Sequence, residues 1–153
     1  MNTVIRLSAF ETNSSSSHSM TLGEKDFIPD LLYVDKDGVC EICTGQFGWG
    51  VDFYRDAITK AAYCATWLRN VGEYVKNINV KAYEELFEKV IKKNTGATSV
   101  QIVPNVDGLY GYIDHQSIEE TGGLGLDIFK DFETVETFIF NKSSLLLISN
   151  DNL

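Results

Sequence analysis

The stretch that decides the fold class is NVKAYEELFEKVIKKNTGATSVQIVP, residues 79–104, which passes from a helical pattern to a strand pattern. In its first part, the apolar residues of Tyr83–Ile91 fall at i, i+3, i+4, i+7 and i+8. This spacing predicts an amphipathic helix over 80–94 that packs one face against a core. Asn79 is placed to cap its start and Gly96 to end it.

Two β-hairpins are expected around the helical part of the chain. Residues 98–103 are rich in β-branched residues and predict a strand, with 109–115 as its hairpin partner. Residues 31–35 and 39–44 form a second pair of short strand patterns, and Gly38 between them suits the positive φ of a turn.

The remaining elements complete an α+β pattern. We expect strands over 3–9, 20–22 and 145–148, and helices over 52–71 and 131–140. The last strand is apolar on both faces, as expected of a central strand. Asp131 is placed to cap the short helix. The fold class predicted is therefore α+β, with a mostly antiparallel sheet packed against two longer helices and one short helix in a single domain, 1–153.

Length and cysteine usage narrow the class of protein. A chain of 153 residues can bury a core without disulfides. It has no apolar run of membrane length and no signal-peptide pattern, so we expect a soluble cytoplasmic protein that does not bind membranes. Cys40 and Cys43 form a C-x-x-C, but on a strand they face opposite sides, so no metal site and no cofactor are expected.

The net charge and its distribution distinguish between nucleic-acid and protein partners. The net charge of −9 excludes a nucleic-acid backbone as ligand, because such binding needs a basic face. Residues 105–153 carry nine of the 22 acidic residues and two of the 13 basic ones. This acidic third favours contact with a basic partner protein. The residues expected to make that contact are Glu119, Glu120, Asp127 and Asp131.

Residues 11–19, ETNSSSSHS, form the most unusual polar segment. We interpret it as a loop between two strands, and serine hydroxyls and amides in such a loop can bind an anion. The ligand-binding candidates are Asn13, Ser14, Ser15 and Ser16, and His18 beside Ser17 is a candidate base. A solvated serine-rich loop without a site explains the same pattern equally well.

A second polar segment is GYIDHQS, residues 111–117. Asp114 and His115 would point to opposite faces of a regular strand, so one of them could share a pocket with His18. The candidate catalytic set is thus His18, Ser17, Asp114 and His115. The alternative is a strand end whose polar groups serve the turn.

The segments FETNSSSSHS (10–19) and GYIDHQS (111–117), with the ending from 138 to 152, resemble uncharacterised small proteins of Gram-positive bacteria and their phages. The resemblance implies a bacterial or phage setting and transfers no activity.

Two functions follow as hypotheses. In the first, a small acidic protein of phage or mobile-element type binds a host protein through its acidic C-terminal third. In the second, the chain is a small hydrolase, transferase or anion-binding protein that uses the serine-rich segment and His18 with Asp114 or His115. The motifs of P-loop enzymes, dinucleotide-binding proteins, α/β-hydrolases and zincins are missing from the sequence. The sequence leaves the oligomeric state open.

Overall fold

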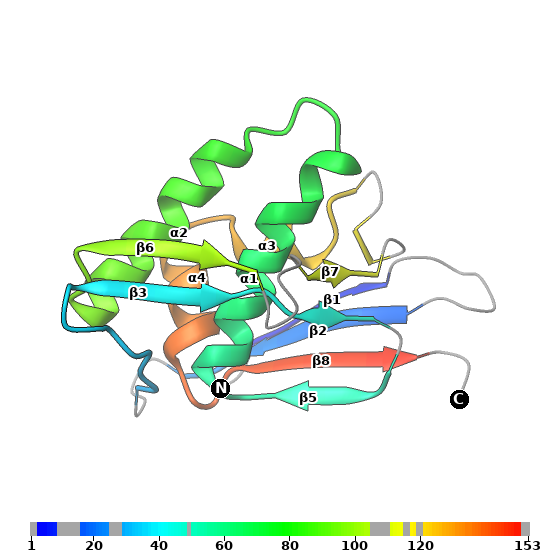
Figure 1. Ribbon diagram of the computed structural model, residues 1–153. Helices are drawn as coiled ribbons and strands as arrows, with labels where there is room; N and C mark the ends of the chain where they lie inside the picture. Colours follow the sequence, from blue (N-terminus) through cyan, green and yellow to red (C-terminus); the bar gives the residue numbers. More distant parts are fainter. Residues whose placement is uncertain are drawn as a thin grey trace.

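The structure is a computed structural model of the 153-residue chain, and it describes residues 3–8, 16–24, 29–48, 50–104, 111–114, 117–118 and 121–150. Several strands precede the two long helices, and further strands and helices follow them along the chain (Figure 1). The fold class is α+β, as predicted. No helix in this described part of the chain is long and apolar enough to cross a bilayer.

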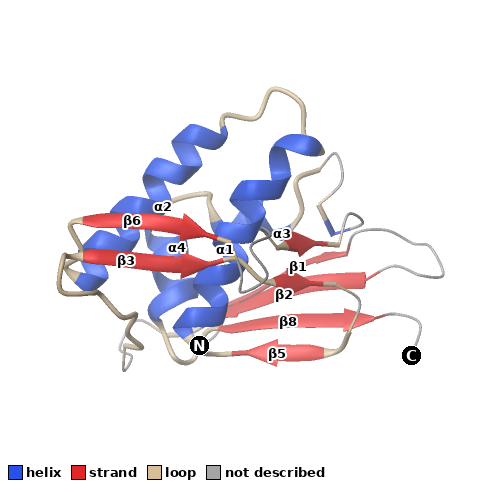
Figure 2. Ribbon diagram, viewed as in Figure 1, coloured by secondary structure: helices blue, strands red, loops and turns tan. Residues whose placement is uncertain are grey.

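The largest sheet has four strands, each antiparallel to its neighbours, and forms one layer of the molecule (Figure 2). The strand order is β1 (Thr3–Ser8), β2 (Ser16–Leu22), β8 (Leu145–Asn150) and β5 (Asp52–Tyr54). The central position predicted for residues 145–148 is confirmed, because β8 pairs with β2 on one side and β5 on the other.

The remaining strands form two parallel pairs, so both predicted hairpins are wrong. β3 (Val39–Cys43) pairs with β6 (Ser99–Val103), and β4 (Gln46–Phe47) pairs with β7 (Tyr112–Ile113). The chain between β3 and β6 passes through both long helices. Parallel strands require a crossover of this kind, which a hairpin turn cannot supply.

The turn before β3 explains why residues 31–35 do not extend into a hairpin. Gly38 has the expected positive φ, 82°. However, the Asp35 carboxylate accepts hydrogen bonds from the amides of Asp37 and Val39, each at 2.9 Å, and the Asp35 amide donates to the Val39 carbonyl. These bonds close a tight loop around Asp35 and end the pairing there.

Helix α1 (Ala57–Asn70) begins later than the predicted helix over 52–71. Asp56 caps this helix, and its carboxylate accepts a hydrogen bond from the Thr59 amide at 2.8 Å. The residues before the cap form β5, because they pair with β8. Phe53 in β5 and Ile58 in α1 are both exposed.

The other helix predictions are confirmed. Helix α2 (Val80–Thr95) is capped by the Asn79 side chain and ends at Gly96, whose φ is 76°. Helix α4 (Phe132–Phe140) begins after Asp131. A short 3₁₀ turn follows α1.

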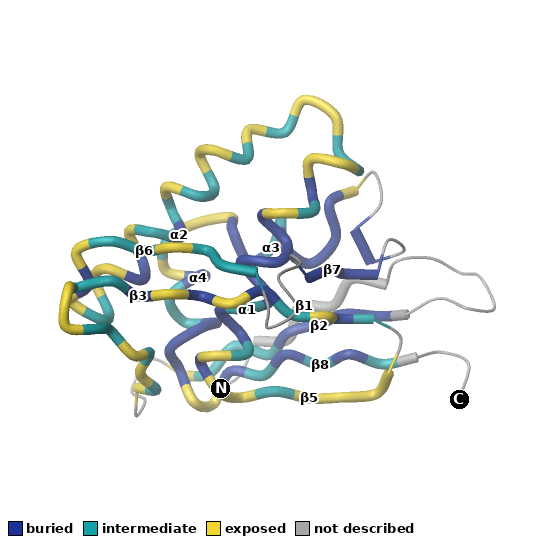
Figure 3. The backbone as a smooth tube through the Cα atoms, viewed as in Figure 1, coloured by how far each residue is buried: buried dark blue, intermediate teal, exposed yellow. Residues whose placement is uncertain are grey.

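The core lies between the four-stranded sheet and the helices (Figure 3). Trp67 of α1 stacks on Phe129, with ring centroids 5.2 Å apart, and its Nε1 donates to the Gly122 carbonyl at 2.7 Å. The one-turn helix α3 (Leu124–Ile128), which was not predicted, brings Gly125 against this indole. A Cβ at Gly125 would overlap the ring, so glycine is required there.

The side chain of Lys60 lies inside the molecule. Lys60 of α1 is fully buried, and its Nζ donates to the Asn141 carbonyl at 2.8 Å and the Ser144 carbonyl at 3.0 Å. Burial lowers the pKa of Lys60 to about 8. The ammonium therefore ties α1 to the turn between α4 and β8.

Candidate functional site

His18, the leading catalytic candidate, lies in a strand. β2 begins at Ser16, so the loop predicted for residues 11–19 is wrong over 16–19. Ladders with β1 and β8 satisfy the backbone of β2 on both sides, which outweighs the low strand preference of serine. Ser17 and His18 are both buried there, with His18 1 % exposed.

Both ring nitrogens of His18 have hydrogen-bond partners. Nδ1 lies 2.9 Å from the Tyr63 hydroxyl, and Nε2 lies 3.3 Å from the Gly48 carbonyl oxygen. Because that carbonyl only accepts, Nε2 carries the proton, and Nδ1 accepts from Tyr63. Burial lowers the pKa of His18 to about 4, against the opposing effects of Gly48 and Asp114. The imidazole is therefore neutral at pH 7.

Asp114 directly follows β7. It is buried, and its amide donates to the Phe47 carbonyl at 2.8 Å. Its charge acts on His18, so the fold brings two of the four catalytic candidates within electrostatic reach of each other. His115 lies outside the described residues, as do the ligand-binding candidates Asn13, Ser14 and Ser15. Of Ser16 the structure describes the backbone alone.

The acidic candidates for partner binding lie in different settings. Asp131 is exposed, and its carboxylate accepts a hydrogen bond from the Thr134 amide at 2.7 Å. Hydrogen bonds with the side chain and the amide of Thr134 lower the pKa of Asp131. Asp127 in α3 is half-buried, and burial raises its pKa. Glu119 and Glu120 lie outside the described residues. Asp131 thus has a structural task, the capping of α4, that its charge alone did not reveal.

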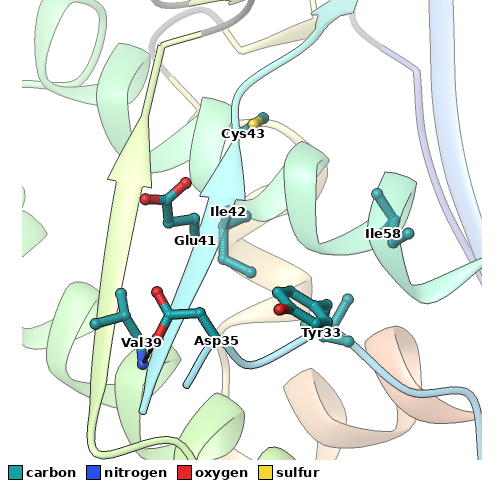
Figure 4. A pocket seen from close by; sticks show the side chains of 8 residues that line it. Tyr33, Asp35, Val39, Glu41, Ile42, Cys43 and Ile58 are labelled. Carbon is teal, nitrogen blue, oxygen red and sulfur yellow. Dashed lines mark hydrogen bonds between the residues drawn. The ribbon is translucent and has the colours of Figure 1, made fainter. Parts of the chain in front are cut away.

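A groove with a volume of about 310 Å³ lies beside β3 (Figure 4). Three separate segments supply its walls: the loop before β3, β3 itself and the first turn of α1. The lining residues are Leu32, Tyr33, Asp35, Val39, Glu41, Ile42, Cys43 and Ile58. The sequence does not indicate this groove, because residues 31–35 are expected to form a hairpin strand.

The groove runs along an edge of β3. On the other edge, the Thr44 amide donates to the Val103 carbonyl at 3.1 Å, in line with the β6 ladder. Because backbone groups alternate along a strand, those of Val39, Glu41 and Cys43 face away from β6. Asp35 satisfies Val39. In the described part of the chain, no strand pairs with the amides and carbonyls of Glu41 and Cys43 on this edge.

The rim of the groove is apolar and exposed. Tyr33 is 81 % exposed and Ile58 is 68 % exposed. Large apolar side chains that gather at a concave site mark a binding surface more often than a free surface. Glu41 and Cys43 are exposed on β3, whereas Cys40 is buried, so the C-x-x-C residues face opposite sides as predicted.

A smaller cavity of about 130 Å³ lies against β6 and α2, where Arg69 and Glu84 form an ion pair at 3.7 Å. No group of three or more metal-ligating side chains gathers anywhere among the residues that the structure describes. Comparison with known proteins finds no family model, no curated protein and no solved structure that matches this chain.

Proposed function

We propose that this chain is a binding protein that holds a segment of a partner protein in the groove beside β3. The observation that carries the proposal is the coincidence of an apolar cavity with a strand edge that lacks a partner strand in the described chain. Such an edge binds protein segments through backbone hydrogen bonds, and the apolar walls add burial.

The chemistry of the lining favours binding over catalysis. Its two carboxylates are Asp35, which holds the turn before β3, and Glu41, which is exposed on the strand. A general acid or base is usually activated by burial or by a charged neighbour at hydrogen-bond distance. Among the described residues, neither carboxylate is fully buried or paired with a basic side chain, so we assign the groove to contact with a partner.

The enzyme alternative depends on His18 and Asp114. A neutral histidine with both nitrogens engaged has no ring atom left to accept a substrate proton unless the Tyr63 or Gly48 bond opens. We therefore place this pair second, as a candidate that the His18 experiment in the Discussion tests.

The first hypothesis located partner binding in the acidic C-terminal third. The groove offers an apolar contact in addition to charge, and the net charge of −9 still favours a basic partner. We accordingly propose the groove as the main contact. The acidic residues Glu119, Glu120, Asp127 and Asp131 then contribute long-range attraction.

A library of random peptides of about twelve residues provides a direct test. The wild type is expected to enrich a peptide family that the double variant Tyr33→Gln/Ile58→Gln binds about tenfold more weakly or worse. The matched control is Val51→Gln/Phe53→Gln, because Phe53 is as exposed as Ile58, at 68 %, but lies outside the groove. Failure of the wild type to enrich any peptide, or equal loss in both double variants, would show that the groove is not a binding site.

A further inference from the structure

We infer that the groove takes a basic, extended segment that adds to β3 as a new strand, an inference that rests on the proposed function. The backbone amides and carbonyls of Glu41 and Cys43 face the groove side of β3 at alternate positions. Alternating edge groups of this kind match an extended chain and do not match a helix.

The turn before β3 fixes where the added strand can begin. Val39 also faces this edge, but its amide donates to the Asp35 carboxylate and its carbonyl accepts from the Asp35 amide. An incoming strand therefore meets its first open backbone groups at Glu41 and its next at Cys43. A short segment with few backbone hydrogen bonds fits this edge.

Side-chain alternation then divides the incoming strand into two faces. Ile42 points inward from β3, and Tyr33 and Ile58 lie on the apolar side of the groove (Figure 4). Alternate residues of the segment would contact these apolar groups. The residues between them would lie on the outer face beside Glu41 and Cys43.

Charge selects the outer residues. Glu41 is exposed on the outer face of β3, and Asp35 stands at the start of the groove. Opposite charges on neighbouring strands stabilise pairing, and like charges oppose it. A lysine or arginine across from Glu41 is therefore favoured. A second copy of this chain is a poor occupant, because it also carries −9 and brings its own Glu41 to the same edge.

The experiment compares peptide families from the same random library. The wild type is expected to enrich peptides with alternating apolar and basic residues, and Glu41→Lys to shift the preference to acidic residues. Glu85→Lys is the matched control: Glu85 is exposed on α2, away from the groove, and its reversal changes the net charge equally. This control is expected to keep the preference for basic peptides.

Backbone recognition needs a separate measurement. The best basic peptide is resynthesised with N-methyl groups at alternate positions, in both registers, and one register is expected to lose at least about tenfold in affinity. Full binding by both methylated peptides would overturn strand addition, and a basic preference that survives Glu41→Lys would overturn the role of Glu41. After either result, the groove remains the proposed binding site if Tyr33→Gln/Ile58→Gln still weakens peptide binding. A wild type that forms a dimer dissociated by this double variant would show that the occupant is a second copy.

Discussion

The His18 ring and the Tyr63 hydroxyl lie 2.9 Å apart, in a bond that joins the interior of the four-stranded sheet to helix α1. The two rings also meet edge to face, with centroids 5.8 Å apart. Tyr63 is fully buried, and burial raises its pKa far above the ordinary tyrosine value. The pair therefore remains neutral across the physiological pH range. Its hydrogen bond links the sheet to helix α1 inside the core.

The His18 environment predicts a loss of stability in acid. The unfolded chain takes up the His18 proton near pH 6.5, whereas the folded chain does so only near pH 4. Between these values the unfolded state binds more protons, so the free energy of unfolding falls as the pH falls, by about 3 kcal/mol in total. Urea unfolding at pH 7 and pH 4.5 is expected to show a smaller drop for His18→Gln than for the wild type.

An NMR titration of the imidazole checks the same point directly, and His115→Gln assigns the signals because the chain has two histidines. A His18 that titrates near 6.5 would mean that solvent reaches the ring. That result would favour the enzyme alternative.

Lys60 predicts a stability effect of a different origin. In Lys60→Met the stem is replaced by a side chain of similar shape, but the Asn141 and Ser144 carbonyls lose a buried donor. We expect a cost of about 2–4 kcal/mol, measured by chemical denaturation. Lys89→Met on the exposed face of α2 is the control and should change stability by less than about 0.5 kcal/mol. Similar small effects for both variants would contradict the proposed tie between α1 and the α4–β8 turn.

Substitutions of Asp131 distinguish the effect of its charge from its role as the cap of α4. Asp131→Asn removes the carboxylate charge but keeps a good cap, so its melting temperature should stay near that of the wild type. Asp131→Ala removes the cap and is expected to cost about 1 kcal/mol. If partner binding uses the acidic charge, both variants should weaken it equally. A reversal to lysine would confuse the two effects, because it also removes the cap.

The central strand gives the largest expected cost. Leu146 is fully buried in β8, and Leu146→Ala should lower the free energy of unfolding by about 2–5 kcal/mol. Leu31→Ala, at a site that is 66 % exposed, should be nearly neutral. Deletion of residues 141–153 should leave the chain unfolded, since β8 pairs with both β2 and β5. A truncated chain that melts cooperatively would show that the sheet does not depend on β8.

Local signals in the sequence predicted the features that local forces determine. The caps Asn79 and Asp131 and the end of α2 at Gly96 each depend on a few neighbouring residues. Strand pairing depends on residues that are far apart in the sequence. β3 pairs with β6, which follows two helices later in the chain, although the glycine turn beside β3 predicts a hairpin with the residues just before it.

The candidate site was hidden for the same reason. The groove exists because Tyr33, Glu41 and Ile58, from three segments, meet in space, and no pattern within any one segment signals their meeting. Conversely, the serine-rich segment looked like a loop because serine is a poor strand former. Tertiary pairing on both sides of β2 outweighs that preference, and this places His18 inside the core.

The pairing of β2 with β8 also bears on how the chain is made. β2 leaves the ribosome early, whereas β8 is synthesised after every other described element. Until β8 is synthesised, β2 can pair only with β1. The edge of β2 that later pairs with β8 is then open to pairing with other chains. We therefore expect the sheet to close only after residues 145–150 have emerged, so the nascent protein depends on chaperones or on rapid completion to avoid aggregation.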